Sequence, residues 1–173
     1  MVKNILITGL PGCGKTTLIK EISSSVNIEK VGFYTEEIRE KGKRVGFKIL
    51  TFSGKEGILA HINFNTPYKV SKYFVSIENL ESIAVAEIEK GLLFENCLII
   101  IDEIGKMELF SEKFKKIVIS AFESPNKVLA TIMLKSDPFC VNIKKRKDTE
   151  IFILERKNYN EIKEKLKTML ESS

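Results

Sequence analysis

The sequence has no uninterrupted apolar run of the length that a membrane crossing requires. A transmembrane helix needs about 20 consecutive apolar residues, so this absence argues against a membrane-spanning protein. The apolar segment at the N-terminus leads into a glycine-rich loop and not into a cleavage site, which argues against a secretory signal. We therefore expect a cytoplasmic protein with no membrane partner.

Cysteine and histidine are also scarce. The three cysteines, Cys13, Cys97 and Cys140, are odd in number, widely spaced and without a C-x-x-C pair. This pattern argues against a disulfide framework and against a structural zinc site, and we expect reduced thiols. The single histidine, His61, stands at an alternating, strand-like position and is predicted to be structural.

Lysine and arginine number 28 against 23 acidic residues, which gives a formal net charge of +5. The densest basic run is KKRK at 144–147. Aromatic residues do not alternate with these cations, so the run lacks the stacking surface that single-stranded nucleic acid needs. We interpret the run as solvated surface, with nucleic acid as an incidental partner at most.

The most specific motif is GLPGCGKTT at 9–17, which has the form G-x-x-x-x-G-K-[ST] and follows the apolar run 2–8. Glycines let backbone N–H groups approach phosphate oxygens, and a helix that begins here directs its positive end at the same anion. Lys15 is predicted to reach the β- and γ-phosphates, and Thr16 to offer its hydroxyl to Mg²⁺. The loop therefore predicts nucleoside triphosphate binding by Gly9, Leu10, Pro11, Gly12, Cys13, Gly14, Lys15, Thr16 and Thr17.

Short apolar runs alternate with segments of helical spacing along the chain. The predicted strands cover 2–8, 97–101, 128–133 and 150–154. The predicted helices cover 17–25, 77–92, 111–123 and 158–169, with Ser111 and Asn158 as N-caps. This alternation predicts an α/β fold, a three-layer αβα sandwich with a mostly parallel sheet.

One region departs from the alternation. Strand-like segments at 31–35, 44–52 and 57–62 are joined by glycine-bearing turns, which predicts antiparallel hairpins. We expect them to form an insertion at about 31–62 or an edge of the sheet, where loops face substrate. At 173 residues the chain fits a single domain, 1–173.

Two acidic residues, Asp102 and Glu103, follow the apolar residues 98–101. In open α/β sheets ligands bind at the carboxyl ends of the strands, so this pair is expected beside the phosphate loop. Asp102 is predicted to orient the magnesium ion together with Thr16. Glu103 is predicted to polarise the water that attacks the γ-phosphorus.

A cation is expected near the γ-phosphate, because the transition state spreads negative charge over its oxygens. The candidates are Arg39, Arg44, Lys106 and Arg146. Spacing alone does not choose among them.

Three blocks resemble the P-loop nucleoside-triphosphatases first named from thermophiles, a family whose human member is the cancer-related nucleoside-triphosphatase. The blocks are GLPGCGKTTLIKEI at 9–22, VGFYTEEIREKGKRVGFKILTFSGKEG at 31–57 and IIIDEIGKMELFSEKF at 99–114, with KKRKD at 144–148 as a weaker fourth. The resemblance implies a RecA-like core. It also implies Mg²⁺-dependent hydrolysis of ATP, GTP and other nucleoside triphosphates to diphosphate and phosphate, with little base selectivity.

The same resemblance assigns roles to single positions. It implies Lys15 and Glu103 as catalytic residues, Thr16 and Asp102 as metal-holding residues and Arg146 as a further nucleotide contact. Lys106 and Glu108 belong to the third block without an assigned role.

The residues leave three functions open. Hydrolysis with water as the acceptor is favoured. A kinase that phosphorylates a nucleotide or another small molecule shares the same phosphate and metal chemistry. A nucleotide-dependent switch that binds a protein or RNA is the third. We expect a monomer, and the sequence does not indicate the physiological substrate or the preferred base.

Overall fold

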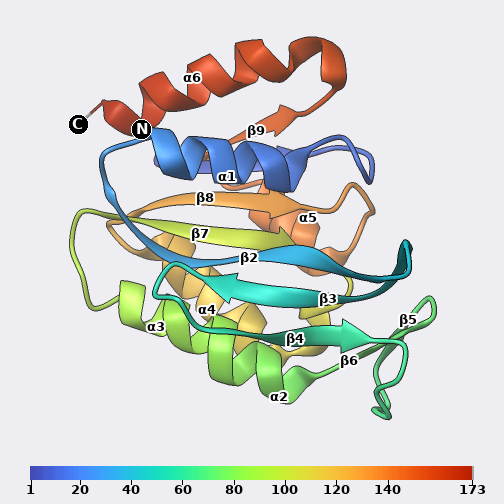
Figure 1. The fold of residues 1–173 in the computed structure, drawn as a ribbon. Helices are drawn as coiled ribbons and strands as arrows, with labels where there is room; N and C mark the ends of the chain where they lie inside the picture. The colour runs from blue at the N-terminus through green and yellow to red at the C-terminus, as the bar shows by residue number, and fades with distance from the viewer. Residues whose placement is uncertain (173) are drawn as a thin grey trace.

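The computed structural model describes residues 1–172, and all the strands in this range belong to one nine-stranded sheet (Figure 1). Its strand order is β5-β6-β4-β3-β2-β7-β8-β1-β9. The strands are β1 (Asn4–Thr8), β2 (Glu29–Glu40), β3 (Lys43–Thr51), β4 (Glu56–His61), β5 (Lys69–Val70), β6 (Tyr73–Val75), β7 (Cys97–Ile104), β8 (Lys127–Ile132) and β9 (Thr149–Ile153). The four strands predicted from apolar runs correspond to β1, β7, β8 and β9.

The sheet is mixed, which corrects the prediction of a mostly parallel one. The pairs β1–β8, β1–β9, β2–β7 and β7–β8 are parallel, whereas β2–β3, β3–β4, β4–β6 and β5–β6 are antiparallel. The reason lies in β2. Its residues 29–33 pair with β7 as a core strand, and its residues 33–40 continue along β3. The hairpins therefore extend the core sheet at one edge.

Helices cover both faces of the sheet (Figure 1). They are α1 (Lys15–Ser25), α2 (Ile77–Asn79), α3 (Ala86–Gly91), α4 (Glu112–Glu123), α5 (Pro138–Lys144) and α6 (Tyr159–Glu171). A π-helical turn, Leu80–Val85, joins α2 to α3, and 3-10 turns occupy Glu108–Phe110 and Arg156–Asn158. None of the helices in residues 1–172 combines the length and apolar character of a membrane span.

The core divides into two apolar layers, one on each side of the sheet. The layer under α1 and α6 includes Leu18, Ile22 and Leu166, all fully buried. The layer on the other side includes Phe114 and Phe122 from α4, also fully buried. Complete burial of such side chains contributes about 1.5–3 kcal/mol each, so these two layers fix the strands and hence their carboxyl ends.

Two local predictions about helix ends have different outcomes. Ser111 caps α4 as predicted, since its hydroxyl accepts the N–H of Phe114 at 3.0 Å. The cap predicted at Asn158 is wrong in its chemistry. Its side chain makes no cap bond to α6 and instead accepts the N–H of Glu155 at 2.8 Å, closing the preceding 3-10 turn.

Candidate active site

The phosphate-loop sequence connects β1 to α1, and it needs glycine at Gly9 because of close packing and at Gly14 because of its backbone conformation. A Cβ on Gly9 would lie 2.7 Å from the Cys13 sulfur and 2.8 Å from the Leu154 carbonyl oxygen. Gly14 immediately precedes α1 with φ of 102°, a left-handed conformation that side chains disfavour. The loop therefore turns tightly and leaves the first N–H groups of α1 directed at the carboxyl edge of the sheet.

Lys15 is the first residue of α1, and its ammonium group lies over the loop. The Nζ atom donates to the carbonyl oxygens of Gly9 at 2.9 Å and Leu10 at 3.4 Å. No described carboxylate pairs with it in an ion pair within 4 Å, so its charge is held by neutral carbonyl groups. This arrangement keeps a cation over the loop, where an anionic ligand is favoured.

Asp102 lies near the end of β7 and is 2% exposed to solvent. Its carboxylate contacts three neighbouring elements. The Thr16 hydroxyl donates to Oδ2 at 2.8 Å, the Thr131 hydroxyl to Oδ1 at 2.6 Å, and the Thr35 N–H to Oδ2 at 3.5 Å. Burial raises the pKa of this carboxyl, and the hydroxyl donors oppose that rise. The carboxylate predicted from the sequence thus meets the hydroxyl predicted to share its metal.

Glu103 and Glu108 stand close to Asp102 but differ in exposure. Glu103 is partly buried, and burial raises its pKa while the charge of Lys15 lowers it. Glu108 is 4% exposed, and burial followed by repulsion from Glu103 raises its pKa well above the ordinary value. The site therefore holds one partly exposed acid, Glu103, and a second, Glu108, whose charged form is disfavoured by burial.

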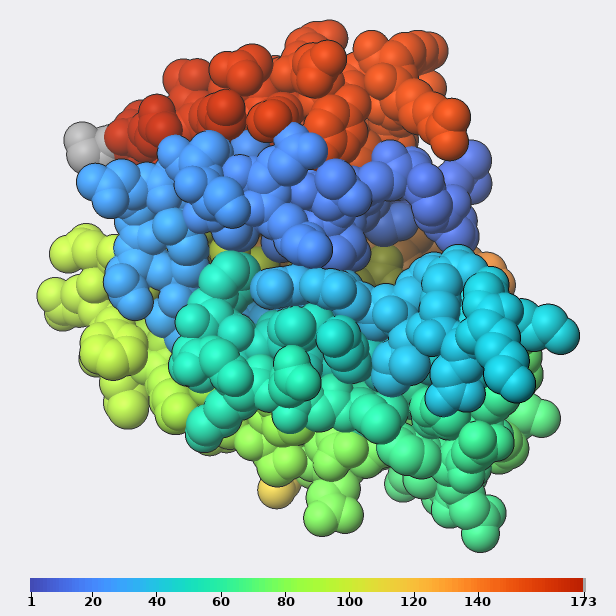
Figure 2. Space-filling model, viewed as in Figure 1, coloured from blue at the N-terminus to red at the C-terminus, as the bar shows by residue number. Residues whose placement is uncertain are grey.

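Two adjoining hollows meet at this point, and Figure 2 shows the blue phosphate-loop segment and the cyan β2–β3 segment on either side of a recess. The first, of about 610 Å³, is lined by the phosphate loop, the start of α1 and Asp102, and we call it the phosphate hollow. The second, of about 510 Å³, lies between the phosphate loop, the end of β7 and the antiparallel strands, and we call it the side cavity. Lys15 and Glu103 line both.

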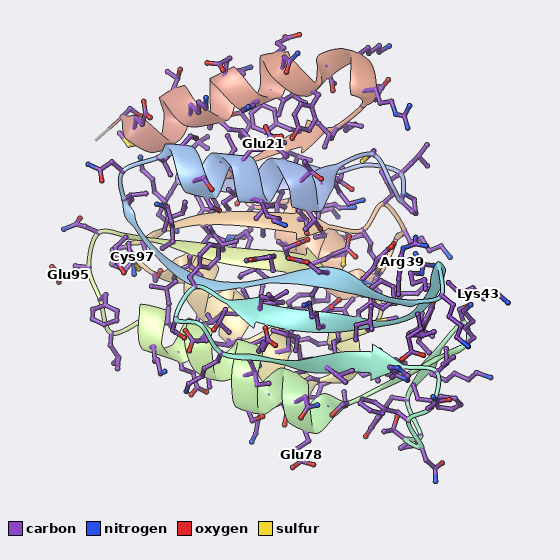
Figure 3. The ribbon with its side chains drawn as sticks, viewed as in Figure 1. Glu21, Arg39, Lys43, Glu78, Glu95 and Cys97 are labelled. Atoms are coloured by element: carbon purple, nitrogen blue, oxygen red, sulfur yellow. The ribbon has the colours of Figure 1, made fainter. Side chains whose placement is uncertain are left out.

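The candidate cations occupy different places. Arg44 lines both hollows, and its guanidinium donates to the Tyr73 hydroxyl at 2.8 Å and to Glu37 at 3.1 Å. Lys106 lines only the side cavity. Arg39 lies at the far tip of the β2–β3 hairpin near Lys43, where it pairs with Glu37 at 2.8 Å (Figure 3). Arg44 is therefore the arginine that the fold brings to the phosphate hollow.

Arg146 requires a correction. Its guanidinium pairs with Asp148 at 2.9 Å and donates to the Phe122 carbonyl oxygen. The Asp148 carbonyl oxygen accepts the N–H groups of Lys3 and Asn4, which places this pair beside the start of β1. The phosphate loop follows the other end of β1, about 16 Å away at 3.3 Å per residue. The sequence did not predict the short helix α5. This helix leads the basic run 144–147 to the edge of the sheet where β1 begins, opposite to the phosphate loop.

Sequence reasoning missed two groups that hold Asp102. Thr131 is fully buried in β8, and a hydroxyl inside the apolar run 128–133 was an available signal. Thr35 contributes a backbone N–H and lines both hollows, and nothing in the local pattern indicates this. The burial of Glu108 was not predicted either, although an acidic residue in a mostly apolar segment was an available signal.

Together, the α/β fold with helices on both faces and the phosphate loop facing a buried carboxylate define a nucleotide-binding class of protein. The chain belongs to the NTPase family, whose model matches residues 4–167. It is 52% identical over 166 residues to nucleoside-triphosphatase THEP1 of Thermotoga sp. (strain RQ2), covering 96% of this chain and 94% of that one.

Solved structures agree with this membership. The crystal structure of THEP1 from Aquifex aeolicus superposes with a TM-score of 0.88 at 36% identity, covering 98% of this chain and 99% of that one. The solution structure of a human cancer-related nucleoside triphosphatase gives a TM-score of 0.81 at 34% identity, covering 99% of each chain. The resemblance inferred from the three sequence blocks is thus confirmed.

The buried acid Glu108 predicts a pH dependence of stability. Its pKa is raised in the folded protein, so its stabilising contribution is complete below the ordinary value of 4.5 and is lost as pH rises through the folded pKa. Between pH 5 and pH 8, the free energy of unfolding measured in urea should fall less for Glu108→Gln than for the wild type. The exposed Glu112→Gln is the control, and parallel pH profiles for wild type and Glu108→Gln would contradict the prediction.

Proposed function

We propose that this chain hydrolyses nucleoside triphosphates to diphosphate and phosphate. One observation carries the proposal: the Thr16 hydroxyl contacts the Asp102 carboxylate at 2.8 Å, beside Lys15 and Glu103. Membership of the NTPase family and the names of its relatives support the same reaction. The loop residues 9–17 are assigned to the phosphates, and a RecA-like core with little base selectivity is part of the proposal.

The residues present fit Mg²⁺. The ion prefers oxygen ligands and keeps several waters, and a threonine hydroxyl next to a buried carboxylate supplies that donor type. Thr16 and Asp102 would hold it. When bound, the ion neutralises charge that develops on the phosphate oxygens. Among residues 1–172 no cluster of three or more His, Cys, Asp or Glu side chains forms a cage, so the substrate's own oxygens would complete the coordination.

Each remaining residue has a separate task. The loop N–H groups and Lys15 bind and orient the triphosphate, and Arg44 provides a further cation beside it. Glu103 accepts the proton of the attacking water as the oxygen–phosphorus bond forms and the bond to the diphosphate oxygen breaks. Thr131 and Thr35 position Asp102 through hydrogen bonds to its carboxylate.

The test is phosphate release from ATP, GTP, CTP and UTP at equal concentration, with no acceptor, in Mg²⁺ and in excess EDTA. We expect release from all four at similar rates in Mg²⁺ and none in EDTA. Negligible release despite tight nucleotide binding would contradict hydrolysis as the function.

The side cavity favours phosphoryl transfer to a small molecule as a second candidate, because it offers room for an acceptor next to Glu103. Incubation with γ-³²P-labelled ATP and either nucleosides or nucleoside 5′-monophosphates separates the two. Hydrolysis leaves the label in free phosphate. More label in a phosphorylated acceptor than in free phosphate would replace hydrolysis by the kinase function.

A further inference from the structure

The side cavity is larger and more apolar than hydrolysis requires. Water needs about 30 Å³ per molecule, whereas this cavity measures about 510 Å³. Its apolar lining includes Phe47, Leu59, Val70, Tyr73, Met107 and Met133. Volumes of 300–1,000 Å³ with mainly apolar walls and a few polar groups are typical of small-molecule sites.

Most of the residues that line the cavity do not line the phosphate hollow. Tyr73 and Val70 line this cavity alone, Val70 on the short edge strand β5, and Tyr73 packs edge to face on Phe47 with ring centroids 5.1 Å apart. Gly12, Gly14, Thr16 and Asp102 line the phosphate hollow and do not line this cavity. The two hollows therefore offer different chemistry on either side of a shared boundary, which is formed by Pro11, Lys15, Thr35, Arg44, Phe47 and Glu103.

Charge at the cavity points to an anion. Four cationic side chains, Lys15, Arg44, Lys106 and Lys135, line it against two acids. Lys106 and Lys135 are exposed, lie close enough that Lys135 lowers the pKa of Lys106, and form no ion pair with any residue between 1 and 172. Two adjacent ammonium groups without a counterion attract an anionic group.

We propose that the side cavity binds a second small molecule, an amphiphilic anion with an apolar ring or branched body and one phosphate, carboxylate or sulfonate group held by Lys106 and Lys135. This inference rests on the proposed function, because the cavity matters through its position beside Glu103. A bound molecule fills the space on that side of Glu103 and restricts the entry of water. Its occupancy therefore slows phosphate release without displacing the nucleotide.

The probe is 8-anilinonaphthalene-1-sulfonate, which has an aromatic body and one sulfonate and fluoresces in apolar surroundings. We expect saturable fluorescence with the wild type, unchanged by saturating Mg²⁺ and a non-hydrolysable ATP analogue. The double variant Lys106→Glu/Lys135→Glu should weaken the affinity by about fivefold or more. The exposed pair Lys116→Glu/Lys147→Glu is the matched control and should bind the probe as the wild type does.

A second variant blocks the cavity by volume. Val70 is half-buried on an edge strand, so Val70→Trp places its larger side chain in the cavity without opening the core. It should abolish probe binding, whereas Ile119→Trp on the exposed face of α4 should not. The probe should slow phosphate release by the wild type. Val70→Trp should release phosphate at the same rate with and without the probe.

The outcomes separate this inference from the proposed function. Probe binding that survives both cavity variants, or that the ATP analogue displaces, overturns the second site. Probe bound in the cavity with no change in phosphate release overturns its effect on water entry. Phosphate release by the wild type without probe tests the proposed function alone. The titration of probe fluorescence tests the second site, whether or not the protein hydrolyses nucleotide.

Discussion

Replacing Glu103 with glutamine is expected to reduce the rate of nucleoside triphosphate hydrolysis by about 10²–10⁴-fold while nucleotide affinity is retained. The amide keeps the size and position of the side chain but does not accept the proton of the attacking water. Glu103 is the acid that suits this task, because it lines both hollows and remains partly exposed. Single-turnover phosphate release and equilibrium binding of a fluorescent nucleotide measure the two quantities separately.

Two further variants make this assignment specific. Glu112→Gln changes an exposed glutamate of α4 and should leave hydrolysis unchanged. Glu108→Gln changes the buried neighbour, whose pKa is raised well above the ordinary value by burial, which disfavours the carboxylate that would accept a proton. It should retain most of the activity. Full activity in Glu103→Gln, or an equal loss in Glu108→Gln, would show that another group accepts the proton.

The strands that the sequence predicted correctly include those buried along almost their whole length. β1, β7 and β8 are almost continuous apolar runs because helices cover both of their faces. The contact between Thr16 and Asp102 could also be anticipated, since a phosphate loop and an acid at a strand end belong to the same edge of a parallel sheet. Burial and strand direction together were sufficient for this half of the site.

The parts that escaped prediction have weak or local signals. The second half of β2 carries polar residues on both sides, so its partner β3 and not its own pattern makes it a strand. α5 has only seven residues, and its start is marked by the Asp137 cap and Pro138 alone. Because α5 directs the following basic run to the opposite edge, missing it also misplaced Arg146. The side cavity depends on side chains from β3 to β6 that meet only in the folded protein.

Replacing Asp102 with asparagine is expected to separate activity from stability. The amide loses the charge that would help to hold Mg²⁺, so we expect hydrolysis to fall by about 10²–10³-fold, as when one strong transition-state contact is removed, and the Mg²⁺ requirement to rise. The amide is still able to exchange hydrogen bonds with the hydroxyls of Thr16 and Thr131, which now accept as well as donate. Titration of phosphate release with Mg²⁺ measures the first effect.

Stability should move in the other direction. Burial raises the pKa of Asp102, so its stabilising contribution is complete below the ordinary value of 3.8 and is lost as pH rises through the folded pKa. Above that pH the asparagine variant avoids the cost of a buried charge, and thermal unfolding in EDTA should give a midpoint no lower than that of the wild type. Asp137→Asn is the matched control, because asparagine caps a helix as well as aspartate does. Loss of stability together with activity in Asp102→Asn would contradict the metal-holding role. The carboxylate would then be a structural anchor that joins β7 to α1, β2 and β8.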